Sequence, residues 1–552
     1  MQKNIILKIN FCTLLILALS SAQVQRWKYQ YNGGGGDAAY KVVYTRDNYV
    51  CAAGQTIYPG MEQDMMLVGL DTLGNLVWGP LYYGYYYTDI VYNLRSSQDN
   101  NLYLAGSATI RPDEDFDFVI LAATSTGSPT WSYVYDYASS YDEAYSVVQG
   151  TDGNVYAAGY NCEGNWTEGF DFDFIVISLT NGGTQRWMYQ YNDGGFRPWR
   201  TDGAYDIVYG DDDNIYAAGD ISNDTLGTQS YDLAVVSLTP SGTQRWVYIY
   251  NGPADNMDDA RSTVYKNGKI YVAGFSTGTG TSHDITVLCV NTSGQQQWVY
   301  RYNGSANGLD EARQIIYGDD GNLYITGYCS GSGTSNDFIV ISLDTLGNER
   351  WVYTKNSPSN SQDEAYSVTY GQNSIYACGF IYNGTARDAF AVISLDTMGN
   401  EKWTYLYDGV ANGYDHARSI VFGNDRNIYA AGEAAETGQF NSDFTVISLR
   451  DTTFTGIEDK KESSLQTKKL NLIVKTPTGK NLAFLLSSSK PEDAVFSIYN
   501  SIGQKILSKK INISSGLEYH NITLPQNLSC GVYFLKVEIT GQSLVGKFVL
   551  FE

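Results

Sequence analysis

Histidine is scarce in this sequence, and the common catalytic motifs are missing. Three of the 552 residues are histidines: His283, His416 and His520. The sequence has no H-E-x-x-H, G-x-S-x-G, phosphate-loop or dinucleotide-binding motif, and no helical pattern follows the glycine run at residues 32–37. These absences argue against zinc hydrolases of that class and against enzymes with a histidine-activated nucleophile.

Cysteine is present, but without the spacings that bind metals or form redox pairs. Of the seven cysteines, Cys12 lies in the N-terminal apolar segment, no two are adjacent, and no C-x-x-C occurs. We therefore predict that the other six are mostly small buried hydrophobic side chains, although an exported protein meets an oxidising environment.

Long apolar runs are confined to the N-terminus. Lys3 and Lys8 precede an apolar run at residues 11–19, and Ala22 ends a small-residue cleavage pattern, so residues 1–22 are predicted to be a signal peptide. The run is too short to span a bilayer, and the rest of the sequence has no longer one. We expect no transmembrane segment.

Basic residues are in short supply in one part of the chain. From Glu458 onward there are 12 lysines and 8 acidic residues, whereas the region between the predicted signal peptide and that point has 22 basic and 51 acidic residues. Such a region would repel phosphates, so we expect no nucleic-acid partner. We expect no cofactor; calcium, which prefers carboxylate ligands, is left open.

Against these absences stands a strong repeat. Tryptophan recurs at intervals of 51 to 59 residues. Each unit has four short runs rich in Val, Ile and Tyr between Gly, Asn and Asp turns, and none has a helical period. The sequence predicts an all-β fold: an eight-bladed β-propeller over residues 23–450, with seven blades as the alternative. The phase of the repeat predicts that the N-terminal strand completes the last blade. The tryptophans are Trp27, Trp78, Trp131, Trp187, Trp246, Trp298, Trp351 and Trp403.

Two features of the repeat resemble known families. The pattern D-x-A-x-x-V-x-Y-G-x-D-G-N-x-Y-x-A-G, approximated by residues 202–219, resembles the bacterial SBBP-type β-propeller repeat family. Residues 341–351 resemble the tryptophan-docking motif of quinoprotein-type propellers. The resemblance implies that the eight tryptophans form a girdle, each packed on the neighbouring blade. It does not imply an activity, because propellers host many functions, and the adjacent cysteines of a quinone site are absent.

The composition changes after the last repeat. Residues 451–468 are predicted to be a linker, and residues 469–552 a small C-terminal β-sandwich domain. This part resembles the type A C-terminal sorting domain of the type IX secretion system. The matching residues are Ile498, Tyr499, Gly503, Gly531, Tyr533, Phe534 and Lys547. The resemblance implies export to the periplasm by the signal peptide, recognition by the type IX machinery, and a secreted or outer-membrane-surface location. An ordinary β-sandwich module is the alternative.

Two aspartates recur in every unit, one before each A-x-x-V strand and one before each F-x-V-I-S-L strand. A feature present in every blade cannot single out one catalytic pair, so we interpret these residues as acceptors of backbone N–H groups. The first set is Asp37, Asp89, Asp142, Asp202, Asp258, Asp310, Asp363 and Asp415. The second set is Asp64, Asp117, Asp173, Asp232, Asp284, Asp337, Asp388 and Asp443.

Departures from the repeat are better candidates for a binding site. The third and fourth units are the longest, and their extra loops contain aromatic and arginine residues favoured in binding hot spots. The alternative is that these side chains pack over a long loop. The candidate ligand-binding residues are Trp166, Phe170, Phe196, Arg197, Trp199 and Arg200.

Taken together, these patterns favour a secreted or cell-surface binding module over an enzyme. We expect a monomer whose propeller binds a glycan or a protein and whose C-terminal domain directs export. An extracellular polysaccharide-acting enzyme with carboxylates in the propeller funnel is the alternative, and a purely structural module is a third. We assign no catalytic residue and no metal ligand.

Overall fold

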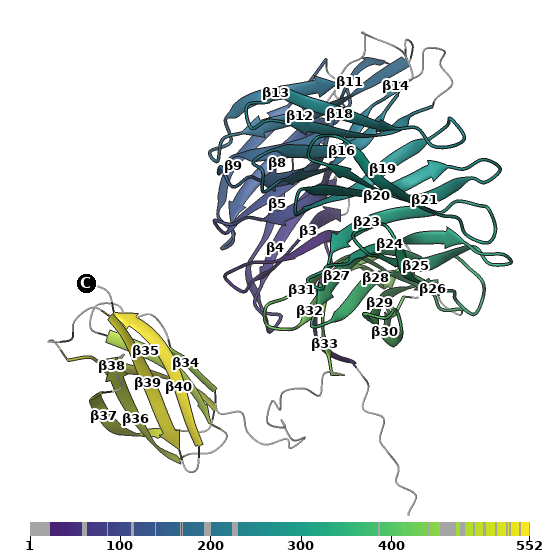
Figure 1. The fold of residues 1–552 in the computed structure, drawn as a ribbon. Coiled ribbons are helices and arrows are strands. Elements are labelled where there is room, and N and C mark those ends of the chain that lie inside the picture. Colours follow the sequence, from purple (N-terminus) through teal and green to yellow (C-terminus); the bar gives the residue numbers. More distant parts are fainter. Residues whose placement is uncertain are drawn as a thin grey trace, which may run out of the picture. The chain divides into compact units, whose positions relative to one another are not determined.

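The computed structural model describes most of the chain from residue 23 onward. Residues not described are 1–22, 58–62, 85–86, 112–114, 139, 166, 168, 192–199, 223–229, 385–386, 412, 439–440, 453–470, 475–480, 489–491, 501–503, 514–515, 526–527, 529–530, 540–541 and 551–552. The regular elements of the described part are β-strands (Figure 1), and none of its segments is a helix long and apolar enough to cross a membrane. The all-β prediction is confirmed. The chain forms two compact units, Met1–Phe454 and Thr455–Glu552.

The described part of the first unit is a β-propeller of eight antiparallel sheets (Figure 1). Each sheet has four main strands, and the innermost strands of neighbouring sheets contact one another, including the last (β31) and the first (β2). The inner strands are β2 (Ala38–Tyr44), β6 (Asp89–Ser96), β10 (Glu143–Gln149), β15 (Gly203–Tyr209), β19 (Asp258–Lys266), β23 (Glu311–Tyr317), β27 (Glu364–Gly371) and β31 (His416–Phe422). The second strands are β3 (Val50–Ile57), β7 (Asn101–Ala108), β11 (Val155–Asn165), β16 (Ile215–Ile221), β20 (Lys269–Thr277), β24 (Leu323–Ser330), β28 (Ser374–Tyr382) and β32 (Ile428–Gly438).

The third and fourth strands complete each sheet on its outer side. The third strands are β4 (Gln63–Leu70), β8 (Asp117–Thr124), β12 (Gly169–Leu179), β17 (Asp232–Leu238), β21 (His283–Asn291), β25 (Asn336–Leu343), β29 (Asp388–Asp396) and β33 (Asn441–Asp451). The outer strands are β5 (Leu76–Tyr83), β9 (Pro129–Tyr135), β13 (Gln185–Tyr191), β18 (Gln244–Tyr250), β22 (Gln296–Tyr302), β26 (Glu349–Lys355), β30 (Glu401–Tyr407) and β1 (Gln23–Tyr31). A short extra strand, β14 (Arg200–Thr201), pairs in parallel with β12.

Strand β1 closes the ring. It pairs antiparallel with β33, with Trp27 opposite Ser448 and Tyr31 opposite Phe444, so one sheet contains both ends of the repeat region. The predicted closure by the N-terminal strand is confirmed. The main strands of the seven other propeller sheets are consecutive in the chain. This sheet is therefore the one among those described that joins residues about 400 positions apart, and it bears the entropic cost of closing that loop.

The outer strands carry the tryptophan girdle. Trp351 Nε1 donates to the Thr397 carbonyl at 3.0 Å, and its ring lies over Gly399, which has φ +86°. The same bond, at 2.8–3.2 Å, joins six other girdle tryptophans to the third hairpin of the next sheet. Trp403 is the exception: it is 5% exposed, and its Nε1 has no acceptor among the described residues. It faces β33 and β1, which come from opposite ends of the chain and share no hairpin.

Every inner strand contains a β-bulge near its start. In the pairing of β2 with β3, Tyr40 is skipped after the Ala39–Gly54 pair and has no cross-strand partner. A Cβ atom on Gly54 would lie 1.9 Å from the Ala38 carbonyl oxygen, so this approach of two backbones requires glycine. The other seven inner strands show the same shift. We call the eight skipped residues the bulge ring: Tyr40, Tyr92, Tyr145, Tyr205, Arg261, Arg313, Tyr366 and Arg418.

The second unit is a two-sheet β-sandwich. One sheet has the order β34–β35–β38 and the other β37–β36–β39–β40. Their core includes Phe496, Ile498, Leu535 and Val537. The strands are β34 (Asn471–Val474), β35 (Asn481–Ser488), β36 (Glu492–Asn500), β37 (Lys505–Ile513), β38 (Gly516–Thr523), β39 (Gly531–Ile539) and β40 (Gln542–Leu550).

Candidate functional site

The bulge ring is the strongest candidate site. All eight side chains are partly buried. Because the inner strands of neighbouring sheets contact one another, these side chains lie around the propeller axis near the end where the inner strands begin. Ring contacts between neighbouring sheets join Tyr92 to Tyr145, Tyr145 to Tyr205, Tyr205 to Arg261, and Tyr366 to Arg418. A bulge re-aims a side chain away from the ladder, and bulges are common beside functional sites. The residue type at this position differs between sheets, with tyrosine in five and arginine in three, so the ring departs from the repeat.

Half of the ring is aromatic. Tyr92 stacks on Tyr145 with ring centroids 4.7 Å apart, and Tyr145 meets Tyr205 edge to face at 5.2 Å. Glu143 lies among the hydroxyls of Tyr92, Tyr145 and Tyr160, and burial raises its pKa although those hydroxyls oppose the change. This side of the ring presents tyrosine faces and a carboxyl group that is easily protonated.

The other half holds three arginines and one further tyrosine, Tyr366, and each arginine has an acidic partner. Arg261 Nη2 lies 2.8 Å from Asp259 Oδ2, and its guanidinium lies 5.2 Å from the Tyr205 ring centre. Arg313 bridges two carboxylates, with Nη1 3.8 Å from Glu311 and Nη2 3.7 Å from Glu364.

The third arginine anchors a histidine network. Arg418 Nε donates to both oxygens of Glu433 at 3.0 and 3.1 Å, and its Nη2 lies 3.0 Å from His416 Nδ1. His416 Nε2 is 2.8 Å from Asp388. Burial opposes protonation of His416, but Asp388 and Glu433 prevail and raise its pKa. His283 makes a similar contact, with Nδ1 3.0 Å from Glu311. Two of the three histidines therefore contact acidic partners of the ring arginines.

Carboxyl groups beside the arginines have divergent pKa values. Burial raises the pKa of Asp259 to about 6 although Arg261 opposes it, with Glu311 adding to the rise. At Glu311, burial is outweighed by the His283 hydrogen bond and by Arg313, so its pKa is lowered. Burial, with help from Asp259, also raises the pKa of Asp220. The same region thus holds one carboxylate and two groups that bind protons readily.

Several buried polar atoms here have no partner within the described residues. They are Asp220 Oδ1, Asp259 Oδ1, Arg261 Nε and Arg313 Nε. Asp220 and Asp259 are each 2% exposed. Because unsatisfied buried polar atoms are rare in folded proteins, their concentration beside the ring indicates hydrogen-bonding capacity that the fold itself does not use.

The first set of repeated aspartates has the structural role that the sequence suggested, whereas Asp284, Asp388 and Asp443 of the second set contact the side chains of Arg301, His416 and Asn32. Asp310 accepts the Ser330 N–H at 2.7 Å, and its own N–H donates to the His283 carbonyl of the previous sheet at 2.9 Å. Equivalent acceptor bonds are made by Asp37, Asp142, Asp258, Asp363 and Asp415. These residues therefore hold the start of each inner strand against the neighbouring sheet.

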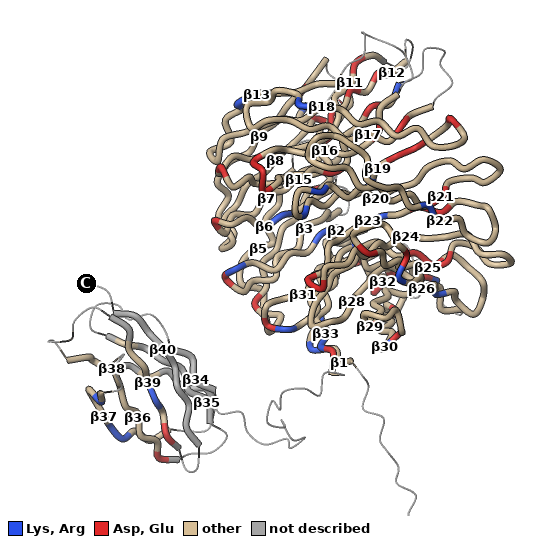
Figure 2. The backbone as a smooth tube through the Cα atoms, viewed as in Figure 1, with Lys and Arg blue, Asp and Glu red and all other residues tan. Residues whose placement is uncertain are grey.

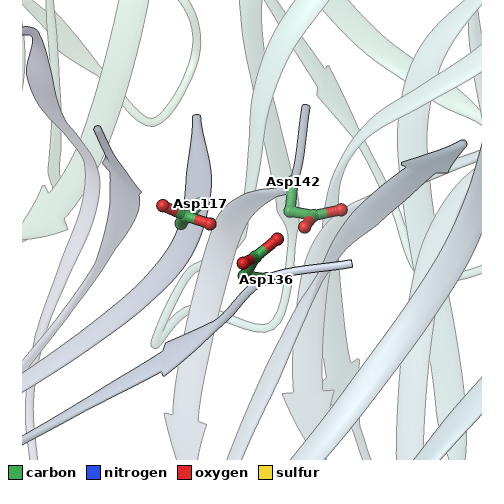
Figure 3. Close-up of side chains that lie close together, drawn as sticks. All are labelled: Asp117, Asp136 and Asp142. Carbon is green, nitrogen blue, oxygen red and sulfur yellow. The ribbon is translucent and has the colours of Figure 1, made fainter. Parts of the chain in front are cut away.

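Two of these aspartates, together with Asp136, are close enough to hold a cation. Ligand atoms of Asp117, Asp136 and Asp142 lie within 4.8 Å of one another (Figure 3). All three also have protein partners: Asp142 accepts the Cys162 N–H at 3.0 Å, Asp117 accepts the Ile110 N–H at 3.3 Å, and Arg111 lies 3.1 Å from Asp136. Because each carboxylate is already engaged, binding of calcium remains a prediction. Figure 2 shows Asp and Glu at many other places in the propeller.

The loop patch predicted from the sequence is described at two of its six residues. Phe170 is 7% exposed and meets Tyr141 edge to face at 5.4 Å. Arg200 is 5% exposed and forms ion pairs with Asp171 and Asp202. Both side chains are thus buried where β14 meets β12. Trp166, Phe196, Arg197 and Trp199 lie outside the described residues, so ligand binding by this patch stays a prediction.

The bulge ring escaped the sequence analysis, although a signal was present. The glycine that ends each Y-x-A-G-type run is the residue that permits the bulge. The ring position is the residue that directly follows each D-x-A-type run, and its type varies between units. Reading that position across the units gives five tyrosines and three arginines.

In the second unit, the predicted sorting residues lie on its central strands. Ile498 is fully buried and Tyr533 is 5% exposed. Tyr499 on β36 pairs with Phe534 on β39, which pairs with Lys547 on β40. Gly531 begins β39 opposite Leu550, whereas Gly503 lies outside the described residues. Residues 477–551 match the secretion system C-terminal sorting domain family. The protein is therefore exported by the type IX system, whose machinery is its partner, and is secreted or held at the cell surface.

Comparisons of the whole chain give weaker similarities. One solved structure is PorZ, an essential bacterial surface component of the type IX secretion system of Porphyromonas gingivalis, with 10% identity, coverage of 93% of this chain and 81% of that one, and a TM-score of 0.30. Another is a fungal alcohol oxidase of the AA5 family, with 12% identity, 84% and 96% coverage, and a TM-score of 0.37. A third is an α-L-arabinanase from Penicillium chrysogenum, with 12% identity, coverage of 56% of this chain and 92% of that one, and a TM-score of 0.33. A search of curated proteins finds no match.

Proposed function

We propose that this exported protein is an eight-bladed propeller that binds an uncharged carbohydrate at the bulge ring. The observation that carries the proposal is the division of one ring into a tyrosine half and an arginine–carboxylate half. The blade count is supported by the eight sheets and by the contact of β31 with β2. Kinship with SBBP-type repeats and the type A class of sorting domain are inferred from the sequence motifs alone.

The two halves suit the two surfaces of a sugar. Tyrosine combines a large apolar face with a polar hydroxyl, as the C–H face and the hydroxyl edge of a sugar require. On the other side, guanidinium and carboxylate groups lie side by side and offer donors and acceptors to neighbouring hydroxyls. Asp259, Glu311, Glu364 and Glu433 balance the three arginines, so this half has no excess positive charge to select an anion.

A glycan array probed with the purified protein tests the proposal. Tyr145→Ala should weaken binding to the best glycan at least tenfold, because it removes an aromatic face in the ring, whereas Tyr145→Phe should bind nearly as well as the native protein. Arg313→Ala should also weaken binding. Tyr133→Ala, on outer strand β9, is the matched control and should have no effect. Equal binding by all four variants would reject the ring as the site.

A polysaccharide-cleaving enzyme is the second candidate, favoured by one observation. The pKa of Asp259 is raised to about 6 and that of its neighbour Glu311 is lowered, and opposed pKa values mark acid and base partners in glycosidases. Release of reducing ends from a bound polysaccharide, lost in Glu311→Gln, would establish it. Binding without release of reducing ends would support the binding function and reject the enzyme.

A further inference from the structure

A cavity lies toward the opposite end of the inner strands from the bulge ring, where these strands turn into the second strands. Its volume is about 620 Å³, and its walls come mainly from the inner strands of the first six sheets. Val148, Val208, Val264 and Ile316 supply apolar surface, and Tyr209 and Tyr265 supply aromatic surface near the hairpins. The volume is in the range of small-molecule sites, and the walls combine this apolar surface with polar and charged side chains.

One side chain in this cavity breaks the repeat. Arg95 occupies a position that is valine, isoleucine or threonine in the other seven inner strands, at Val43, Val148, Val208, Val264, Ile316, Thr369 and Val421. Its side chain is 48% exposed, and among the described residues its ion pair is a long contact of 3.8 Å to Asp206 Oδ1. Arg95 thus lines the cavity with a guanidinium that the described part of the fold engages only weakly.

Two arginines and one carboxylate line the cavity. Asp206 is already engaged, because it accepts the Ser146 hydroxyl at 2.8 Å and the Thr263 N–H at 2.8 Å. Arg46 donates to the Gln98 carbonyl at 2.7 Å. Other carboxylates near the hairpins are also engaged, since Asp99, Asp211 and Asp213 accept hydrogen bonds from side chains of the cavity wall. Arg95 is therefore the charged group of the wall that has the weakest protein partner among the described residues.

We propose that this cavity is a binding site for a small organic anion, with Arg95 gripping a carboxylate and the Val, Ile and Tyr walls holding an apolar or planar body. The fork of an arginine matches a carboxylate through two parallel hydrogen bonds. The cavity is lined by other residues than the bulge ring, so the proposal stands independently of carbohydrate binding there.

The repeat itself supplies the test variant. Arg95→Val installs the residue type of the other inner strands and should fold normally. In isothermal titration of the full-length protein, we expect sodium benzoate to bind at least tenfold more tightly than benzyl alcohol, its uncharged counterpart. Arg95→Val should weaken benzoate binding at least tenfold, and Arg95→Lys should fall between. Arg186→Gln, on outer strand β13, is the control and should bind like the native protein.

D-glucuronate, titrated in parallel, distinguishes the ligand's source. Tighter binding of benzoate assigns the cavity to aromatic or apolar acids, and tighter binding of glucuronate assigns it to acidic sugars; both support an anion site at Arg95. The proposal is overturned if neither compound binds at 10 mM, if benzyl alcohol binds as well as benzoate, or if Arg95→Val leaves affinity unchanged while circular dichroism shows a native fold.

Discussion

Replacing single girdle tryptophans by phenylalanine should give opposite results at two positions. Trp351 and Trp403 have matched surroundings: each meets a buried tyrosine, Tyr324 or Tyr376, with ring centroids 6.0 and 5.9 Å apart. They differ in exposure, because Trp403 is buried whereas Trp351 is partly exposed over Gly399, and in one hydrogen bond. Trp351 Nε1 donates to the Thr397 carbonyl at 3.0 Å, whereas Trp403 Nε1 is buried without an acceptor among the described residues.

The magnitude follows from that difference. Both substitutions remove the same atoms, and the larger packing loss at the more buried Trp403 offsets part of the difference. Trp351→Phe also loses a hydrogen bond worth about 1 kcal/mol; the Thr397 carbonyl keeps a bond from Arg350 at 3.1 Å and is not left unsatisfied. Trp403→Phe instead removes a buried unpaired donor, which relieves about 1–3 kcal/mol. We therefore expect Trp403→Phe to be more stable than Trp351→Phe by about 2 kcal/mol or more.

Calorimetry on the full chain is the assay. With an unfolding entropy of about 2.1 cal/mol/K per residue over a unit of about 430 residues, 2 kcal/mol moves the melting temperature by about 2 °C, so urea titration followed by circular dichroism should accompany it. Double substitution should be additive, because the two sites share no partner. Equal losses at both positions would refute the reasoning and mean that girdle stability comes from packing alone.

Three further predictions concern backbone, charge and export. Gly399→Ala should cost more stability than Gly153→Ala in urea unfolding: both have positive φ, but a Cβ atom on Gly399 would lie 2.6 Å from the Trp351 ring, and one on Gly153 would meet nothing within 4 Å; similar losses would count against the docked ring. Burial, with help from Asp117 and Asp136, raises the pKa of Asp142 to about 8. The folded state therefore holds a proton that the unfolded chain releases near pH 4, so the free energy of unfolding should fall as pH rises from about 4 to about 8. The Asp142→Asn variant should show a flatter dependence on pH. Deleting the chain from Leu470 onward should leave the propeller melting transition unchanged but keep the protein in the periplasm, and its normal appearance outside the cell would contradict the sorting role.

The fold was accessible from sequence because its constraints are local and repeated. The turn at residues 344–348 was predicted from its Asp, Gly and Asn, and Asp344 does accept the Leu346 and Asn348 N–H groups at 2.8 and 2.9 Å. The buried state of five cysteines was likewise predicted. Ring closure by β1 followed from the phase of the repeat, since a terminal blade lacking one strand needs it from the other end.

The site was harder to predict, because it depends on the direction in which side chains point from the sheet rather than on residue type. Sequence spacing did not show that one residue of each inner strand is skipped by the ladder, so the tyrosines and arginines of the ring were assigned to ordinary strand positions. Arg200 misled in the opposite sense: an arginine in an inserted loop suggests a binding surface, but it is buried beside Asp171 and Asp202. The electrostatics of a loop residue depend on which carboxylates the fold brings to it.

The bulge also explains why the asymmetry of this propeller gathers at its axis. Most positions of a blade must match a partner strand or the neighbouring blade, so their residue types repeat. A bulge residue has no cross-strand partner, as at Arg313, which is skipped after the pairing of Ala312 with Gly327. Its identity is therefore released from the repeat and free to serve a ligand. The same reasoning applies to Arg95, whose side chain faces a cavity rather than a neighbouring blade, so that charge there costs the fold little.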